Sequence, residues 1–125
     1  MIYGLGIDMV EVARIERAIE RWGHRLIERV FTPHEMECCS KRKSPHSCFA
    51  LRLAAKEAFS KSIGLGMSNG VRWKDIEVVH DTKGKPEIKL YGEAYQIFKG
   101  KGLNNILLSL TDEGGWAIAA VVLEG

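Results

Sequence analysis

The side chains best suited to chemistry in this sequence are Glu57 and Lys61, which lie one helical turn apart in the stretch from Phe49 to Gly64. Ala, Leu, Lys and Glu dominate this stretch, which favours a helix. When the stretch is placed on a helix at about 100° per residue, apolar residues fall nearly all round it, so most of its sides should be buried. Apolar neighbours solvate charges poorly, so these two groups are candidates for a site that handles charge.

The same spacing supports a second interpretation with equal weight. A Glu and a Lys at positions i and i+4 also form an ordinary ion pair on a wet helix surface, which contributes a few tenths of a kcal/mol. The ends of the helix are easier to predict. Ser44 is a candidate N-cap followed by a first-turn proline, Pro45, and Gly64 occupies the position of a left-handed C-cap.

A third candidate, Asp8, lies on the first predicted strand. Residues 2–8 have the composition of a strand, and Gly4 and Gly6 permit another backbone to approach closely. Asp8 is at the C-terminal end of this strand, where a carboxylate is well placed to face a crevice.

A basic ridge follows on a predicted amphipathic helix from about residue 11 to 28. Apolar residues recur there at helical spacing, and arginines line another face at positions 14, 17, 21 and 25. The more common outcome for such a pattern is a solvated helix whose arginines pair with neighbouring glutamates, here Glu16, Glu20 and Glu28. The alternative is a docking surface for an acidic protein.

A second, compact basic cluster precedes the long helix. Thr32 and Glu35 have the spacing of a capping box, which predicts a short helix from Pro33. The cluster itself is Lys41, Arg42 and Lys43. Such a cluster is usually a solvated loop, but its place beside a helix start also suits phosphate groups.

The second half of the chain predicts mainly strands. After a Gly/Ser/Asn loop to residue 70, we expect a hairpin over 76–80 and 86–91, a short helix around 94–98, and a closing hairpin over 104–111 and 116–123. The last strand is apolar at odd and even positions, so helices or a neighbouring subunit should cover both of its faces. Residues 1–125 therefore predict a single small α+β domain, with an antiparallel sheet packed against the long central helix.

Composition excludes several classes of protein. A chain of 125 residues builds one core, and a net charge of +2 is too mild for a nucleic-acid-binding protein. The three cysteines fit neither a disulfide framework nor a CxxC metal site, which indicates a reducing compartment. No signal segment or apolar run of roughly 18 residues is present, so we expect a soluble, cytoplasmic protein with no membrane partner.

Two motifs in order carry a family resemblance. One is Gly6-Ile7-Asp8 followed by Arg14, and the other is the run Ala-Ala-Lys-Glu-Ala-Phe-Ser-Lys at 54–61, ending at Gly64. Together they resemble the holo-acyl-carrier-protein synthases, the short type of 4′-phosphopantetheinyl transferase. The resemblance continues through residues 29–32, Gly84-Lys85-Pro86 and the closing hairpin, and covers most of the chain.

The resemblance implies the phosphopantetheinyl transferase fold and a Mg²⁺-dependent transferase of fatty acid biosynthesis. Such an enzyme moves the 4′-phosphopantetheine arm of coenzyme A to a serine hydroxyl of apo acyl carrier protein and releases adenosine 3′,5′-bisphosphate. By motif match Asp8 and Glu57 are the metal ligands, which suits a hard cation that carboxylates, water and phosphate oxygens coordinate. The longer type of the family commonly has another acid two places after the first aspartate, where this chain has the apolar Val10.

The resemblance also implies roles for individual residues. The catalytic set is Asp8, Glu57 and Lys61, with Lys61 stabilising the pyrophosphate and Glu57 proposed as the base for the attacking serine. Acyl carrier proteins are acidic and dock on the first helix, so we expect partner contacts from Arg14, Arg21 and Arg25. For coenzyme A, we nominate Lys41, Arg42 and Arg52 as phosphate contacts, Gly64 and Gly66 for backbone approach, and Ser109 for a polar contact.

The sequence departs from the family near its C-terminus. Many members have a pattern like H-x-S-[IL]-[ST]-H, but here Leu107 and Asp112 replace both histidines, and only Ser109 and Thr111 retain polar groups. Members of the short type form homotrimers with active sites between subunits, which agrees with the apolar last strand. Two other functional classes stay open: a non-catalytic module that docks an acidic protein, and a structural oligomer in which Glu57 and Lys61 are only a core ion pair.

Overall fold

The computed structural model of the chain describes residues 1–64, 66–67 and 70–125. Its elements, in chain order, are β1 (Ile2–Glu11), α1 (Val12–Trp22), α2 (His24–Val30), α3 (Pro33–Ser40), α4 (Pro45–Ile63), the 3₁₀ turn η1 (Trp73–Asp75), β2 (Ile76–His80), β3 (Pro86–Leu90), α5 (Gly92–Gly100), β4 (Asn105–Glu113) and β5 (Trp116–Glu124). Part of the predicted loop between Gly64 and Gly70, namely Leu65, Ser68 and Asn69, lies outside the described residues.

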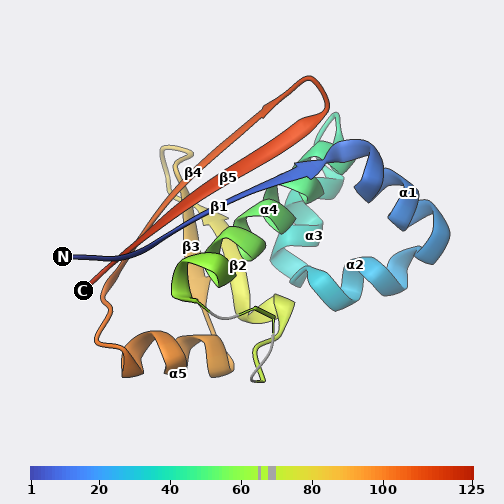
Figure 1. The fold of residues 1–125 in the computed structure, drawn as a ribbon. Helices are drawn as coiled ribbons and strands as arrows, with labels where there is room; N and C mark the ends of the chain where they lie inside the picture. Colours follow the sequence, from blue (N-terminus) through green and yellow to red (C-terminus); the bar gives the residue numbers. More distant parts are fainter. Residues whose placement is uncertain (65, 68–69) are drawn as a thin grey trace.

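Two antiparallel sheets surround the long helix α4. One sheet has the strand order β1-β5-β4, and the other is the hairpin β2-β3. Figure 1 shows α4 along one face of the three-stranded sheet, with α1, α2 and α3 beyond one end and α5 near the other. The predicted α+β architecture, an antiparallel sheet packed against a long central helix, is confirmed.

The contact between β1 and α4 is made by backbone rather than by side chains. A Cβ atom built on Gly6 would lie 1.9 Å from the carbonyl oxygen of Ala58, and one built on Gly4 would lie 2.0 Å from that of Ser62. Any residue larger than glycine would therefore push the strand off the helix. This close approach places the residue that follows on the same face of β1, Asp8, directly beside α4.

Helix α3 begins as the sequence predicts. The Thr32 hydroxyl accepts a hydrogen bond from the Glu35 backbone amide, and the Glu35 carboxylate accepts one from the Thr32 amide, which completes the capping box. Helix α4 ends at Gly64 in the left-handed conformation, as predicted. At its start, however, the Ser44 hydroxyl donates to the Ser47 hydroxyl and does not cap the helix backbone.

The helix predicted over residues 11–28 was wrong in one respect. Gly23 adopts a positive φ of 62° and divides the segment into α1 and α2. Because glycine tolerates this conformation without a steric penalty, it ends one helix, and the next begins at His24. Strand β1 is also longer than predicted and continues to Glu11.

The prediction that the cysteines form no disulfide was wrong. Cys39, near the end of α3, is joined to Cys48 in the first turns of α4, with 5.4 Å between their Cα atoms, and Cys38 is free. Cysteine counting could not find this pair, because it depends on how α3 folds back against α4. The disulfide closes a short loop that carries the basic cluster Lys41, Arg42 and Lys43.

The outer face of the three-stranded sheet is apolar and uncovered. On β1 the side chains that point away from α4 are exposed, namely Ile2, Leu5, Ile7 and Met9. On β5, Ala117, Ala119, Val121 and Leu123 are buried, while the alternate residues are only partly covered. Helices therefore cover one face of β5, whereas the described residues leave the other accessible to a partner. No helix in the described ranges combines the length and apolar character that a membrane span requires.

The close approach of β1 to α4 predicts a strong effect of Gly6→Ala. The new methyl group would meet the backbone of Ala58, which cannot rotate away, so we expect a loss of about 2 kcal/mol or more in the free energy of unfolding, measured with urea. Gly100→Ala is the matched control, because nothing lies within 4 Å of its Cβ position. Equal stability of the two variants would contradict this account of the packing.

Candidate active site

Three side chains predicted to act together meet between β1 and α4. Lys61 donates a hydrogen bond from Nζ to Oδ1 of Asp8 at 2.7 Å and another to the Ile7 carbonyl at 3.2 Å. The carboxyl group of Glu57 lies against that of Asp8. Lys61 thus pairs with Asp8, and within the described ranges it forms no ion pair with Glu57. The simple i,i+4 pair on one helix is not the arrangement found.

The environment gives the two carboxyl groups different acidities. Burial, and then the neighbouring Asp8 carboxylate, raise the pKa of Glu57 from 4.5 to about 7. Burial also tends to raise the pKa of Asp8, but the neighbouring Glu57 carboxyl group, the hydrogen bond from Lys61 and the charges of Lys61 and Arg14 outweigh it, so this pKa is lowered. At neutral pH Asp8 is ionised, and Glu57 can accept or release a proton.

The acid pair has the donor atoms that a hard cation requires. Oδ2 of Asp8 is buried and accepts no hydrogen bond from the residues that the structure describes, and the Glu57 carboxyl group is a neighbour of the Asp8 carboxylate. Carboxylate oxygens are suitable ligands for Mg²⁺, whose remaining positions are usually filled by water and substrate phosphate oxygens. In the part of the chain that the structure describes, no third His, Cys, Asp or Glu joins them. Asp8 and Glu57 therefore fit a cation shared with substrate.

The site is open on the side of Lys61. The Lys61 side chain is 58% exposed, whereas that of Asp8 is only 12% exposed. The pKa of Lys61 is raised by the hydrogen bond and charge of Asp8, so its ammonium group stays protonated. This geometry puts a permanent positive charge at the mouth of the acid pair, where it can contact an anionic group of a ligand.

The predicted coenzyme A contacts at Lys41, Arg42 and Arg52 lie toward the other end of α4. Arg52 is buried and donates to the carbonyl oxygen and Sγ of Cys48, while its Nε and Nη2 have no hydrogen-bond partner among the described residues. Lys41 is exposed and pairs with Glu37 at 3.0 Å, and Arg42 is exposed without an ion pair among the described residues.

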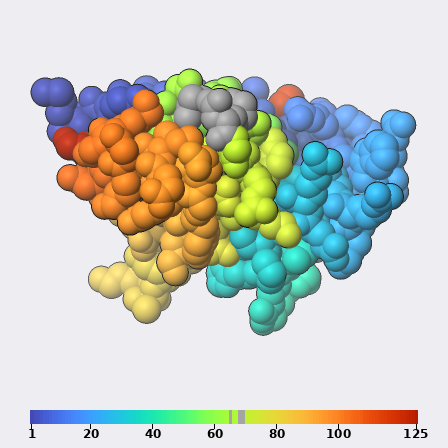
Figure 2. Space-filling model, turned by 90° about the horizontal axis from the view of Figure 1, so that it is seen from below, coloured from blue at the N-terminus to red at the C-terminus, as the bar shows by residue number. Residues whose placement is uncertain are grey.

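Two projections frame a hollow on this side of the molecule. In Figure 2 the segment that follows α3 and the turn between β2 and β3 extend from the same face with a gap between them. The turn contains Gly84 and Lys85 of the third motif. At its base is His80, which sequence reasoning did not select; burial and then the charges of Arg52 and Arg42 lower its pKa. No motif or spacing in the sequence marks this histidine at the end of β2 as a neighbour of Arg52 and Arg42.

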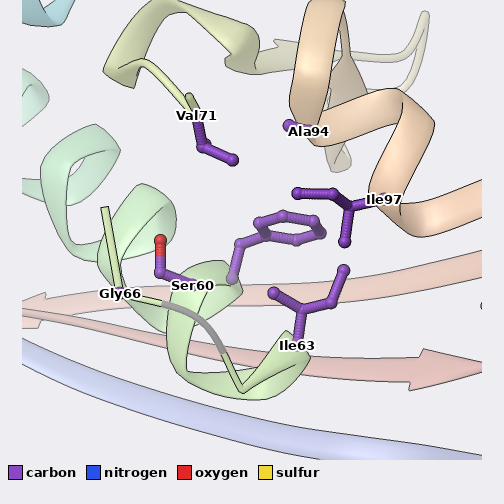
Figure 3. A pocket seen from close by; sticks show the side chains of 7 residues that line it. Ser60, Ile63, Gly66, Val71, Ala94 and Ile97 are labelled. Carbon is purple, nitrogen blue, oxygen red and sulfur yellow. The ribbon is translucent and has the colours of Figure 1, made fainter. Parts of the chain in front are cut away.

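The remaining predicted contacts are less informative. Gly64 and Gly66 are exposed, and Gly66 borders a cavity of about 10 Å³ beneath α5 (Figure 3). That volume is about one water molecule, so this cavity cannot hold a substrate. Ser109 is exposed on β4 opposite Ala120 of β5.

The basic ridge on α1 and α2 is exposed. Arg14, Arg21 and Arg25 make no ion pair within the described ranges, while Arg17 pairs with Glu11 at 3.4 Å. The expected pairs with Glu16, Glu20 and Glu28 are absent from the same ranges. Arg14 has an additional effect that sequence reasoning missed: its charge lowers the pKa of both Asp8 and Glu57. Its place in the first turn after β1 was the available signal.

Comparison with known proteins assigns the chain to a family. A sequence profile of the 4′-phosphopantetheinyl transferase superfamily matches residues 4–121. The chain belongs to this superfamily. It is 49% identical over 124 residues to holo-[acyl-carrier-protein] synthase of Geobacter sp. (strain M21), covering 99% of each chain, and 49% identical to that of Geobacter sulfurreducens, covering 99% and 98%.

Solved structures of phosphopantetheinyl transferases have the same fold. The holo-[acyl-carrier-protein] synthase of Neisseria meningitidis matches with a TM-score of 0.93 and 35% identity over all of both chains. The Helicobacter pylori synthase in complex with coenzyme A matches with a TM-score of 0.85 and 30% identity, covering 96% of this chain and 99% of that one. The predicted family and fold are confirmed.

The raised pKa of Glu57 predicts a pH dependence of stability. A carboxyl group whose pKa is higher in the folded than in the unfolded state stabilises fully below about pH 4.5, and this contribution is lost as the pH rises through about 7. In EDTA, raising the pH from 4.5 to 7.5 should lower the free energy of unfolding of the parent protein by about 1 to 2 kcal/mol more than that of Glu57→Gln. The difference is kept to this size because solvent screens a half-exposed group. Urea unfolding at several pH values measures this, and parallel curves for the two proteins would refute the assignment.

Proposed function

We propose that this chain is a Mg²⁺-dependent holo-acyl-carrier-protein synthase acting in fatty acid biosynthesis. It transfers 4′-phosphopantetheine from coenzyme A to a serine hydroxyl of apo acyl carrier protein and releases adenosine 3′,5′-bisphosphate. The observation that carries the proposal is the meeting of Asp8, Glu57 and Lys61 at one open site. The similarity to named synthases along nearly the whole chain supports the same reaction. We further propose that residues 1–125 form one domain that works in the cytoplasm.

In the proposed mechanism the protein mainly positions groups and stabilises charge. Asp8 and Glu57 would hold Mg²⁺, which would supply positive charge for the pyrophosphate of coenzyme A. The serine oxygen attacks the β-phosphorus, and the bond from that phosphorus to the oxygen of the adenosine bisphosphate breaks. Glu57 takes the serine proton at a carboxylate oxygen. Lys61 stabilises the charge that develops on the departing phosphate.

Coenzyme A is proposed to extend from the acid pair toward the hollow of Figure 2. Lys41 and Arg42 are exposed on the segment that follows α3 and can contact its phosphates. Arg52 is buried, so it contributes charge from beneath the surface through the unpartnered Nε and Nη2. Gly64, Gly66 and Ser109 are exposed and stay proposed contacts. The Helicobacter pylori synthase, solved in complex with coenzyme A, supports a coenzyme A site in this fold.

The protein partners follow from two surfaces. We propose that acidic groups of acyl carrier protein contact Arg14, Arg21 and Arg25, which are exposed on α1 and α2. A homotrimer is proposed to cover the apolar outer face of β1, where Leu5 and Ile7 are 67% and 61% exposed. No nucleic acid or membrane partner is proposed.

The direct test is transfer itself. Purified protein is mixed with coenzyme A, Mg²⁺ and an apo acyl carrier protein, and the intact mass of the carrier is followed with and without EDTA. We expect a Mg²⁺-dependent gain of one phosphopantetheine, and a loss of at least about a hundredfold in rate for Asp8→Asn. No gain from folded protein that still binds the carrier would overturn catalysis and favour a docking module.

The arginine ridge predicts a selective effect on the carrier. The double variant Arg14→Glu/Arg21→Glu should raise KM for acyl carrier protein by about tenfold or more and leave KM for coenzyme A within about twofold. The double variant Lys99→Glu/Lys101→Glu, an equal charge reversal at the exposed end of α5, is the control and should change neither value. Equal effects of the double variant on both substrates would reject the ridge as the docking surface.

A further inference from the structure

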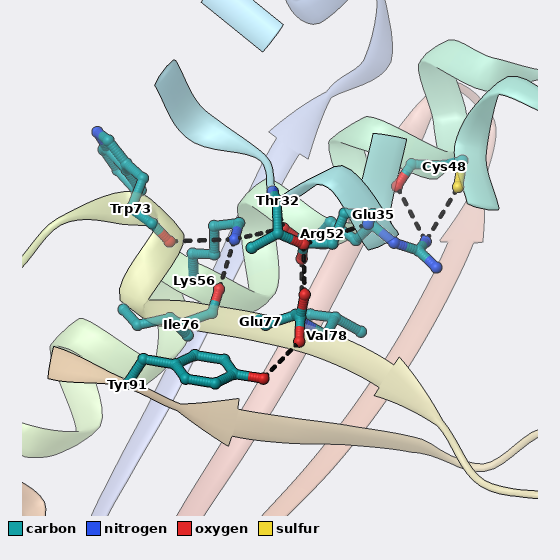
Figure 4. A network of polar contacts seen from close by, with 10 residues as sticks. All are labelled: Thr32, Glu35, Cys48, Arg52, Lys56, Trp73, Ile76, Glu77, Val78 and Tyr91. Carbon is teal, nitrogen blue, oxygen red and sulfur yellow. Dashed lines mark hydrogen bonds and ion pairs between the residues drawn. The ribbon is translucent and has the colours of Figure 1, made fainter. Parts of the chain in front are cut away.

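The proposed mechanism makes no use of Lys56, the neighbour of Glu57 on α4. Lys56 is fully buried, which is rare for a lysine unless its charge is paired. Its side chain lies between α4, α3 and β2, as Figure 4 shows. A charge kept in this position calls for an explanation beyond core packing.

All three donors of the Lys56 ammonium group have an acceptor. Nζ donates to Oε1 of Glu35 at 2.8 Å, to the Trp73 carbonyl at 3.1 Å and to the Ile76 carbonyl. The acceptors come from α3, from η1 and from the start of β2. Three directed bonds to three separate elements define the position of the Lys56 side chain, whereas an apolar side chain of similar length would have no directional contact.

The acceptor Glu35 is itself held on both oxygens. Oε1 also accepts from the Thr32 amide at 3.0 Å, and Oε2 accepts from the Val78 amide at 2.9 Å. Glu35 is fully buried, and in Figure 4 it lies between α4 and the adjacent strand. The Glu35 carboxylate is therefore fixed relative to α3 and β2, and it fixes the Lys56 ammonium group in turn.

This geometry determines how α4 is rotated about its axis. Successive helical residues differ by about 100°, so fixing the direction of Lys56 also fixes that of Glu57. A rotation of about 10° moves a carboxylate that lies roughly 6 Å from the axis by about 1 Å. A misplacement of about 1 Å in an active site can reduce the rate about a hundredfold. The apolar contacts of α4 alone are less strict, because small alanines make up much of its surface, including Ala50, Ala54, Ala55 and Ala58.

We propose that Lys56 and Glu35 are positioning residues for the reaction: their buried ion pair sets the rotation of α4 that presents Glu57 to Asp8. The glycine contact with β1 sets the distance between strand and helix, and the ion pair sets the angle. This inference rests on the proposed function of the acid pair as a divalent-cation site.

The test separates angular positioning from simple stability. Lys56→Met removes the bonds but leaves Glu35 buried and unpaired. The double variant Glu35→Gln/Lys56→Met removes both charges, which usually restores much of the stability that an unpaired charge costs. Phe59→Leu, a buried change on the same helix that touches neither charge, is the matched control for lost stability. Each protein is examined for thermal unfolding, for Mn²⁺ affinity by electron paramagnetic resonance without substrates, and for kcat and KM.

We expect Lys56→Met and the double variant to lose about tenfold in Mn²⁺ affinity and about a hundredfold in kcat, with KM for coenzyme A within about threefold. The double variant should unfold close to the parent temperature, whereas Phe59→Leu should unfold earlier yet keep its Mn²⁺ affinity. Parent-like Mn²⁺ affinity and kcat in the double variant would overturn the inference and leave the pair as core structure. If Lys56→Met does not fold, the double variant alone decides. A parent protein that binds no Mn²⁺ would instead overturn the proposed metal site on which the inference rests.

Discussion

The close approach of β1 to α4 is the constraint on which the rest of this structure depends. Neither Gly4 nor Gly6 has room for a Cβ atom, so strand and helix meet backbone to backbone. This brings an acidic side chain from residue 8 against two charged side chains from residues 57 and 61, which are far apart in sequence. This single contact accounts for the pKa values of both carboxyl groups. It also accounts for the buried Asp8 oxygen that has no hydrogen bond among the described residues, and for the exposed ammonium group of Lys61 beside it.

Much of this site could be predicted because its signals are local. Gly4, Gly6 and Asp8 alternate along one strand, and Glu57 and Lys61 are one turn apart on one helix, so short-range periodicity places each group on the correct face. The motif resemblance then joined the two segments. The fold class followed from the same periodicities, with the buried helix α4 as the strongest. Helix boundaries were harder to predict where a single residue determines them, as Gly23 does between α1 and α2.

What the sequence did not reveal depends on tertiary contacts. The Cys39–Cys48 disulfide exists because α3 folds back on α4, and no count of cysteines contains that information. The burial of Arg52, its contact with Cys48 and the nearby His80 likewise arise from residues distant in sequence. Lys56 stands in the middle of the motif at 54–61, yet its role differs from that of Glu57 beside it. Only the structure shows that these adjacent side chains point to different neighbours, Lys56 to Glu35 and Glu57 to Asp8.

The outer face of β1 has a consequence for the hydration of the active site. Because side chains alternate along a strand, Ile7 and Met9 flank Asp8 in sequence but point to the opposite face, where both are exposed. A protein surface that packed against that face would exclude water from the strand on either side of Asp8. The local dielectric around Asp8, and with it the strength of its attraction for cations, would then vary with the state of assembly. Association and acidity would in this way be coupled through one strand.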